Sequence, residues 1–197
     1  MTNLAGRLAL PAVLAALGVA TFGLPATAGA AQAAAAAPYS VCQTSDNSTT
    51  TYKSKDTYSK VNIRFCAEIA EADDGSRTLQ PYISADAFYY WGLAWYEDNG
   101  KRGADRKSSY ISFDSAEVTG ADGAKLWKEG KTTRYNKGDT GHIEYLGQKI
   151  PVTAGTYKLD FTEVYKGGGY WDHTGEETEH DSWYIGIGDQ SLSVTLT

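Results

Sequence analysis

Apolar and polar residues alternate along most of the chain after residue 40. Between residues 61 and 69 every second side chain is apolar, and the side chains between them are polar apart from Cys66. The same period of two returns at residues 143–145, 157–161 and 192–196. Because successive side chains of a strand point to opposite faces of a sheet, the pattern predicts strands that each bury one face.

Turn signals separate these segments. Asp74-Gly75, Asn99-Gly100 and Asp122-Gly123 are dipeptides that favour tight turns. The best helical candidate, residues 116–127, contains two glycines. About eight short strands with turns between them predict an all-β fold: a single antiparallel β-sandwich, immunoglobulin-like or of jelly-roll type, over residues 41–197. A closed β-barrel is the alternative architecture.

The first 33 residues have the composition of a secretory signal peptide. Arg7 is the only charged residue before residue 46, and an apolar run follows at residues 8–24. A membrane-spanning helix needs about 20 predominantly apolar residues, whereas this run is slightly shorter and is interrupted by Pro11 and Gly18. Small-residue cleavage sites follow the run. They place cleavage near Ala28, Ala30 or Ala33.

Cleavage there predicts a secreted, extracellular protein that keeps no membrane-spanning segment. Residues 34–40 would form a flexible mature N-terminus. The full chain has 18 basic and 24 acidic residues and a net charge of −6, which becomes more negative when Arg7 is removed. Nucleic acids and anionic membranes bind basic surfaces, so the negative net charge argues against both as the main partner.

The two cysteines, Cys42 and Cys66, fit an oxidising compartment, where an even pair indicates one disulfide. Closing a loop of about 25 residues would contribute roughly 3 to 4 kcal/mol in the chain-entropy model. Since Cys66 is on the polar face of the strand at residues 61–69, the bond is expected outside the core or at its margin.

Residues 150–161 combine a turn with an alternating strand. This stretch resembles the turn-then-strand entry that is common in bacterial immunoglobulin-like sandwiches. The resemblance implies a corner hydrogen bond made by Tyr157. It covers about twelve residues and concerns the fold alone, so it implies no function.

Aromatic residues are abundant, with 14 Tyr, 5 Trp and 5 Phe, and six of them fall within residues 88–96. If this segment is one strand, Tyr89, Trp91 and Trp95 share one face with Leu93, and Phe88, Tyr90 and Tyr96 share the other. Aromatics on two faces suggest a platform for a glycan or a wall polymer; the alternative is a central strand covered on both sides. The predicted ligand-binding residues are Tyr90, Trp91, Trp95, Tyr96, Tyr170, Trp171 and Trp183, with Tyr184 beside them.

An acidic segment at residues 167–183 contains two of the three histidines and five carboxylates. Its residues could converge on a metal ion with His142, which precedes Glu144 by two positions on a predicted strand. Ca²⁺ would bind the carboxylates and Zn²⁺ the imidazoles. A solvated acidic loop and a cross-strand surface pair are the plainer interpretations. The candidate metal ligands are His142, Asp172, His173, His180 and Asp181.

These patterns rank three functions. The first is a non-catalytic, secreted binding module for an extracellular glycan or cell-wall polymer, which requires no cofactor. The second is a secreted hydrolase that uses carboxylates or a His-bound metal, and the third is a protein-binding effector such as a protease inhibitor, a toxin or a structural surface protein. No nucleophile elbow, phosphate-binding loop or dinucleotide-binding motif is present in the sequence.

Overall fold

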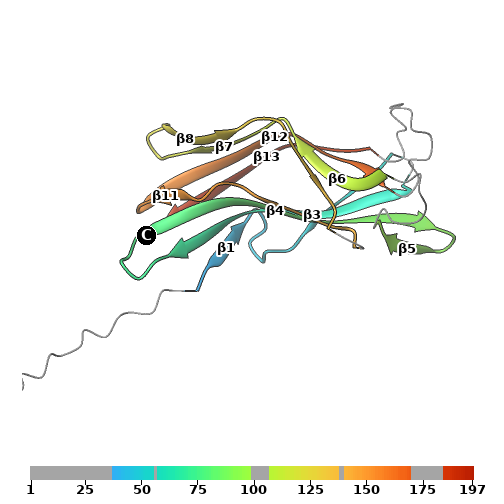
Figure 1. Cartoon of the computed structure of the whole chain (residues 1–197), viewed down its shortest axis with the longest axis horizontal. Coiled ribbons are helices and arrows are strands. Elements are labelled where there is room, and N and C mark those ends of the chain that lie inside the picture. The colour runs from blue at the N-terminus through green and yellow to red at the C-terminus, as the bar shows by residue number, and fades with distance from the viewer. Residues whose placement is uncertain (1–36, 56, 99–106, 138–139, 170–183) are drawn as a thin grey trace, which may run out of the picture. The chain divides into compact units, whose positions relative to one another are not determined.

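A computed structural model describes residues 37–55, 57–98, 107–137, 140–169 and 184–197. Residues 33–197 form one compact unit. The predicted signal peptide, residues 1–33, lies outside the described residues. Within those residues the chain forms thirteen strands and no helix, arranged in two antiparallel sheets that pack against each other and do not close into a barrel (Figure 1). The predicted all-β sandwich is therefore confirmed.

The first sheet is built on two long strands that pair along their whole length, from Ser59 opposite Tyr89 to Glu71 opposite Arg77. Shorter strands share their outer edges, which explains why the described residues contain more strands than the eight expected. The seven strands are β1 (Tyr39–Cys42), β2 (Thr50–Lys53), β3 (Ser59–Glu71), β4 (Arg77–Trp91), β5 (Ala94–Glu97), β10 (His142–Leu146) and β11 (Ile150–Val152).

The second sheet has the same plan. β12 pairs with β13 on one edge, while β7 and β6 share its other edge one after the other. β8 and β9 then pair with β7 and β6. The six strands are β6 (Lys107–Phe113), β7 (Ser115–Thr119), β8 (Lys125–Glu129), β9 (Thr132–Tyr135), β12 (Gly155–Gly169) and β13 (Ile185–Leu196).

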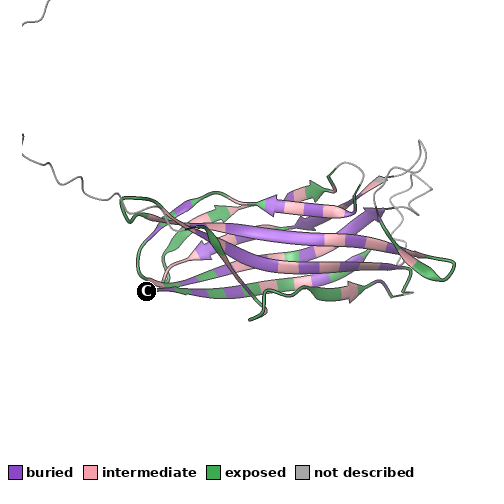
Figure 2. Ribbon diagram, turned by 90° about the horizontal axis from the view of Figure 1, so that it is seen from below, coloured by how far each residue is buried: buried purple, intermediate pink, exposed green. Residues whose placement is uncertain are grey.

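The core lies between the two sheets and follows the alternation in the sequence (Figure 2). Val61, Ile63 and Phe65 of β3 are almost fully buried, and so are Leu159 and Phe161 of β12. Burying such side chains contributes about 1.5 to 3 kcal/mol each, which makes this face the main source of stability. The polar positions between them face outward.

The predicted disulfide joins Cys42 of β1 to Cys66 of β3, which are direct cross-strand partners. The two cysteines form a small cluster with Tyr82, apart from the two main core clusters. The bond is buried, with Cys66 and Cys42 0% and 8% exposed, in a cluster of its own on the opposite side of β3 from Phe65. Immediately after Cys42, the Gln43 side chain donates a hydrogen bond to the Ser191 carbonyl of β13, at 3.0 Å.

The aromatic segment is a hairpin, so the interpretation of residues 88–96 as one strand is wrong. Gly92 has a φ of +65° and begins a two-residue turn, so Trp91 pairs with Ala94 and Tyr90 with Trp95. Glycine at the first turn position is what a type II′ hairpin turn requires. The turn changes the predicted faces: Trp95 shares a face with Tyr90, not with Trp91.

β12 contains an irregularity that reverses which side chains face the core. Its pairing with β13 shifts between Phe161 and Val164, and Glu163 between them has a φ of +50°. Before the shift, odd-numbered residues face inward; after it, even-numbered residues do. This bulge therefore points Tyr165 outward and Lys166 into the core.

Candidate functional site

The predicted ligand-binding residues on the hairpin do not form one flat platform. Trp91 and Tyr96 are 55% and 44% exposed, whereas Tyr90 and Trp95 are half-buried on the opposite face. Tyr90 and Trp95 pack together with ring centroids 5.4 Å apart, and the Lys60 amine lies 4.5 Å from the Trp95 ring. The other predicted binding residues, Tyr170, Trp171 and Trp183, lie outside the described residues.

Of the predicted metal ligands only His142 is described. Its Nδ1 lies 2.8 Å from Oδ1 of Asp86, its cross-strand partner on β4. In the described part of the chain, no three His, Cys, Asp or Glu side chains lie close enough together to hold a metal ion. The remaining candidates, Asp172, His173, His180 and Asp181, lie outside the described residues, so the metal site stays a prediction.

The outer face of the second sheet carries a row of four tyrosines that we call the tyrosine row: Tyr135, Tyr110, Tyr165 and Tyr184. They come from β9, β6, β12 and the residue before β13. Successive ring centroids are 5.6, 6.1 and 5.0 Å apart. Tyr135 and Tyr184 are 60% and 50% exposed, and the two inner rings are half-buried.

Glycines in β12 allow the row to lie close to the sheet. A Cβ at Gly167 would come within 2.4 Å of the Tyr110 ring, so that ring occupies the space a side chain would fill. At Gly168 a Cβ would come within 2.3 Å of the Ser108 carbonyl oxygen, and φ is +63°. Glycine is required at Gly168 by the backbone, whereas at Gly167 it makes room for a ring.

A shallow polar hollow of about 370 Å³ lies along the same outer face, on the other side of the bulge from the tyrosine row. Glu117, Asp160 and Ser191 lie in register across β7, β12 and β13. Asp189 also lines the hollow and accepts a hydrogen bond from the Glu163 amide. Hydroxyls, carboxylates and one ammonium are available here; the lining residues are Ser115, Glu117, Lys128, Asp160, Phe161, Thr162, Asp189, Gln190 and Ser191.

Two of the three carboxylates that line the hollow, Glu117 and Asp160, are paired with lysines. Lys125 donates to Glu117 at 2.9 Å, and this hydrogen bond holds the pKa of Glu117 below its usual range. Lys158 lies 2.9 Å from Asp160. A glycosidase acid needs a carboxyl whose pKa is raised. Glu117 has the opposite property, so it suits hydrogen bonding to a ligand better than proton donation.

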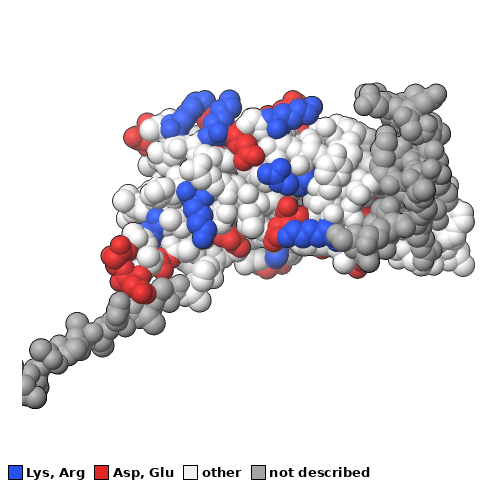
Figure 3. Space-filling model, viewed as in Figure 1, with Lys and Arg blue, Asp and Glu red and all other residues white. Residues whose placement is uncertain are grey.

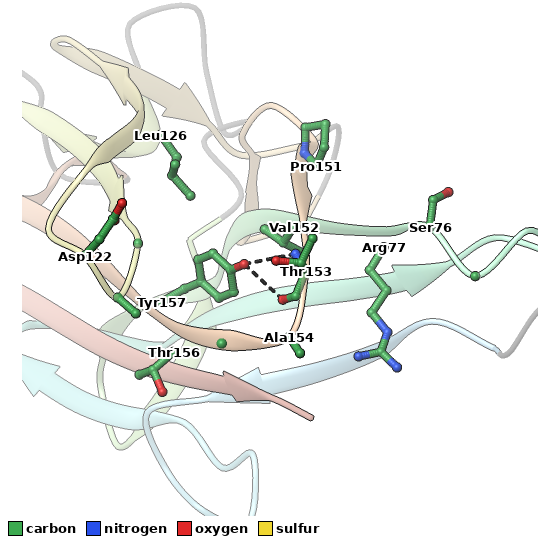
Figure 4. A pocket seen from close by; sticks show the side chains of 14 residues that line it. Ser76, Arg77, Asp122, Leu126, Pro151, Val152, Thr153, Ala154, Thr156 and Tyr157 are labelled. Carbon is green, nitrogen blue, oxygen red and sulfur yellow. Dashed lines mark hydrogen bonds between the residues drawn. The ribbon is translucent and has the colours of Figure 1, made fainter.

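A larger hollow of about 770 Å³ lies at the end of the sandwich where β12 begins (Figure 4). The Tyr157 hydroxyl points across it and bonds to Thr153 twice: it donates to the carbonyl at 2.9 Å and accepts from the amide at 3.0 Å. This is the corner bond that the resemblance to immunoglobulin-like sandwiches implied. Arg77, which also lines the hollow, donates to Glu71 and to the Thr197 carbonyl. The polar groups here bond to one another, which indicates a structural role.

Comparison with protein-family models, with curated proteins and with solved structures gives no match for this chain. The described residues include no helix that is long and apolar enough to cross a membrane. Function therefore has to be argued from the surfaces themselves.

Three members of the tyrosine row, Tyr110, Tyr135 and Tyr165, were missed as candidate site residues. They are far apart in the sequence, and only the pairing of β9, β6 and β12 brings them together. The glycines at residues 167–169 were the available signal, because strand glycines mark a place where something approaches the backbone closely.

Proposed function

We propose that the protein is a secreted, non-catalytic binding module for an extracellular glycan or cell-wall polymer, and that the outer face of its second sheet is the binding face. The observation that carries the proposal is the tyrosine row. The rings lie 5 to 6 Å apart across the strands of one sheet face, exposed at both ends of the row and half-buried in the middle, which suits a ligand with repeated flat apolar surfaces. Sugar rings have such surfaces, and tyrosine adds a hydroxyl for polar contact.

The polar hollow supports the same proposal. Sugars carry many hydroxyls, which need donors and acceptors as well as stacking surfaces. Ser191, Asp160 and Asp189 offer these beside the bulge, and Tyr165 follows the bulge on the same face. A ligand that extends from the tyrosine row along β12 would therefore contact rings on one side of the bulge and polar groups on the other.

Retention of the purified protein on insoluble wall polysaccharides and in affinity gels tests the proposal. We expect Tyr135→Ala combined with Tyr165→Ala to weaken binding about tenfold or more, because each stacked ring contributes roughly 1 kcal/mol. Tyr39→Ala is the matched control, since Tyr39 is 53% exposed on β1 of the other sheet.

Gly167→Ala gives a second test that leaves every tyrosine in place. The added methyl displaces the Tyr110 ring and so breaks the row at its middle. We expect weaker retention with a nearly unchanged fold, measured by circular dichroism. Equal retention of the wild type, the double tyrosine variant and Tyr39→Ala contradicts the proposed binding face, and no retention of the wild type on any glycan contradicts the function.

A further inference from the structure

The hairpin formed by β4 and β5 lies on the other sheet from the tyrosine row, and its tip is apolar on every side. Leu93 at the turn is 96% exposed, and Trp91 before it is 55% exposed. Gly92 and Ala94 are exposed too. No charged residue occurs between Asp86 and Glu97. We call residues 88–97 the aromatic hairpin.

Polarity changes in steps along the aromatic hairpin, away from the tip. The turn presents Leu93, the next levels present tryptophans, and Tyr96 stacks on Tyr89 one level further back with centroids 5.6 Å apart. Charge begins at Glu97, the cross-strand partner of Phe88. At a rise of about 3.3 Å per residue, the three steps from Leu93 to Tyr96 span roughly 10 Å.

This order matches the boundary of a lipid bilayer. Apolar groups enter the acyl region, Trp and Tyr prefer the headgroup level, and charged groups remain in water. Interfacial elements bury their apolar parts about 5 to 10 Å deep. We propose that the aromatic hairpin inserts its tip into the interface of a phospholipid bilayer.

The distribution around the tip favours a lipid over a glycan or a protein. Tyr90 and Trp95 lie on one face of the aromatic hairpin, and Trp91 and Tyr96 on the other. A sugar ring stacks on one face and leaves the other in water, and a protein would need a groove that encloses the turn and both faces. Immersion covers both faces and the turn together, which removes the exposed apolar patch from water. In the space-filling view, charged side chains are spread over the surface that remains visible, whereas undescribed residues cover much of the end that carries β5 (Figure 3).

Lysines lie at the level where lipid phosphates would be. Lys60 of β3 lies over the Phe88 and Trp95 rings, at 4.8 and 4.5 Å, and Lys53 is its direct cross-strand partner. The chain as a whole is acidic, with a net charge of −6, so attraction to anionic lipids is not the main source of affinity. The affinity comes from apolar insertion, and the two lysines set the depth of the hairpin. Binding is therefore expected on neutral phosphatidylcholine vesicles and to persist at high ionic strength.

Co-sedimentation with phosphatidylcholine vesicles tests the insertion. Leu93→Asp is expected to lower vesicle binding about tenfold or more, because a fully exposed leucine that becomes buried is replaced by a charge. Leu126→Asp is the matched control: Leu126 is 43% exposed on β8 of the second sheet, and its replacement should leave vesicle binding unchanged. Since Leu93 is almost fully exposed, its variant should melt at the wild-type temperature.

Three outcomes overturn the insertion. The wild type remains in the supernatant with every vesicle composition, or Leu93→Asp binds vesicles as well as the wild type does, or both leucine variants lose binding equally. If Leu93→Asp reduces retention on a glycan and the wild type ignores vesicles, the aromatic hairpin is a glycan contact instead. If the tyrosine-row variants do not weaken glycan retention, the proposed glycan face is wrong. The vesicle result for the aromatic hairpin still stands, since the two surfaces belong to different sheets.

Discussion

The start of β12, around Tyr157, and its end, around Lys166, close the sandwich in different ways. At the start, an apolar cluster that includes Leu159 and Val194 fills the space between the sheets, and the one buried hydroxyl bonds to Thr153 four residues away. At the end, a fully buried ammonium reaches across to the other sheet. The bulge at Glu163 separates the two regions.

Among the described residues the Lys166 ammonium has three partners: the Ser59 hydroxyl at 3.0 Å, the Asp98 carboxylate at 3.2 Å and the Gly168 carbonyl at 2.9 Å. Burial lowers the pKa of Lys166, and Asp98 acts in the opposite direction. Asp98 follows β5 directly, and its amide donates to the Ala87 carbonyl at 2.8 Å. One charged group therefore connects the base of the aromatic hairpin to the strand that carries Tyr165.

The bulge divides β12 into two parts. The part before it mainly packs the core, and the part after it carries Tyr165 of the tyrosine row. The larger hollow lies at the Tyr157 end, but its polar groups bond to one another. The smaller polar hollow lies just before the bulge, and beyond the bulge the exposed rings gather on both sheets. The surfaces that we propose for binding therefore lie away from the larger hollow.

Removing the buried charge should have the largest effect. Lys166→Met leaves the Asp98 carboxylate buried without its cation, and we expect a loss of about 3 to 5 kcal/mol in the free energy of unfolding, measured by urea denaturation. Lys158→Met on the outer face of the same strand is the control, expected to lose less than about 1 kcal/mol. A loss at Lys166 as small as that at Lys158 would show that the two ends of β12 do not differ.

Removing the corner hydroxyl should have an intermediate effect. Tyr157→Phe keeps the ring in the core and leaves the amide and carbonyl of Thr153 without this partner. We expect a loss of about 1 to 3 kcal/mol in the same denaturation experiment. Glycan retention and vesicle binding should stay at wild-type levels, because the tyrosine row and the aromatic hairpin both lie beyond the bulge. Altered binding would contradict the division of β12 into two halves.

A surface pair on the other sheet should give the smallest effect and a defined pH dependence. Lys137 donates to Glu144, and this bond holds the pKa of Glu144 below its usual range. Because the folded-state pKa is lowered, the contribution is present above the unfolded pKa of about 4.3 and disappears as pH falls through the folded value. Thermal melts of Glu144→Gln should show a deficit of about 0.2 to 1 kcal/mol at neutral pH. A deficit that persists below the folded pKa contradicts this assignment.

Alternation and cysteine count were enough to predict the sandwich and the disulfide. The period of two at residues 61–69 reports burial directly, so β3 and its outward-facing Cys66 could be read from the sequence. The corner bond of Tyr157 was also predictable, because a turn and a strand that follow each other in sequence need no long-range information.

The hairpin and the bulge could not be predicted in the same way. The residues on both sides of the turn at Gly92 and Leu93 are aromatic or apolar, so no change of polarity in the sequence indicates the turn. The bulge at Glu163 depends on the pairing with β13, which is more than twenty residues away in sequence. Without it Tyr165 would be placed in the core and Lys166 outside, and both the tyrosine row and the buried ammonium would be missed.

Gln43 gives the disulfide a further consequence. Among the described strands β13 pairs only with β12, which leaves one edge of a 12-residue strand for other contacts. The Gln43 side chain donates a hydrogen bond to the Ser191 carbonyl on this strand. The disulfide holds Gln43 in place, because it anchors the preceding residue, Cys42. Open edges invite pairing between molecules. Reduction of the disulfide is therefore expected to loosen this contact and leave the edge of β13 more open to self-association.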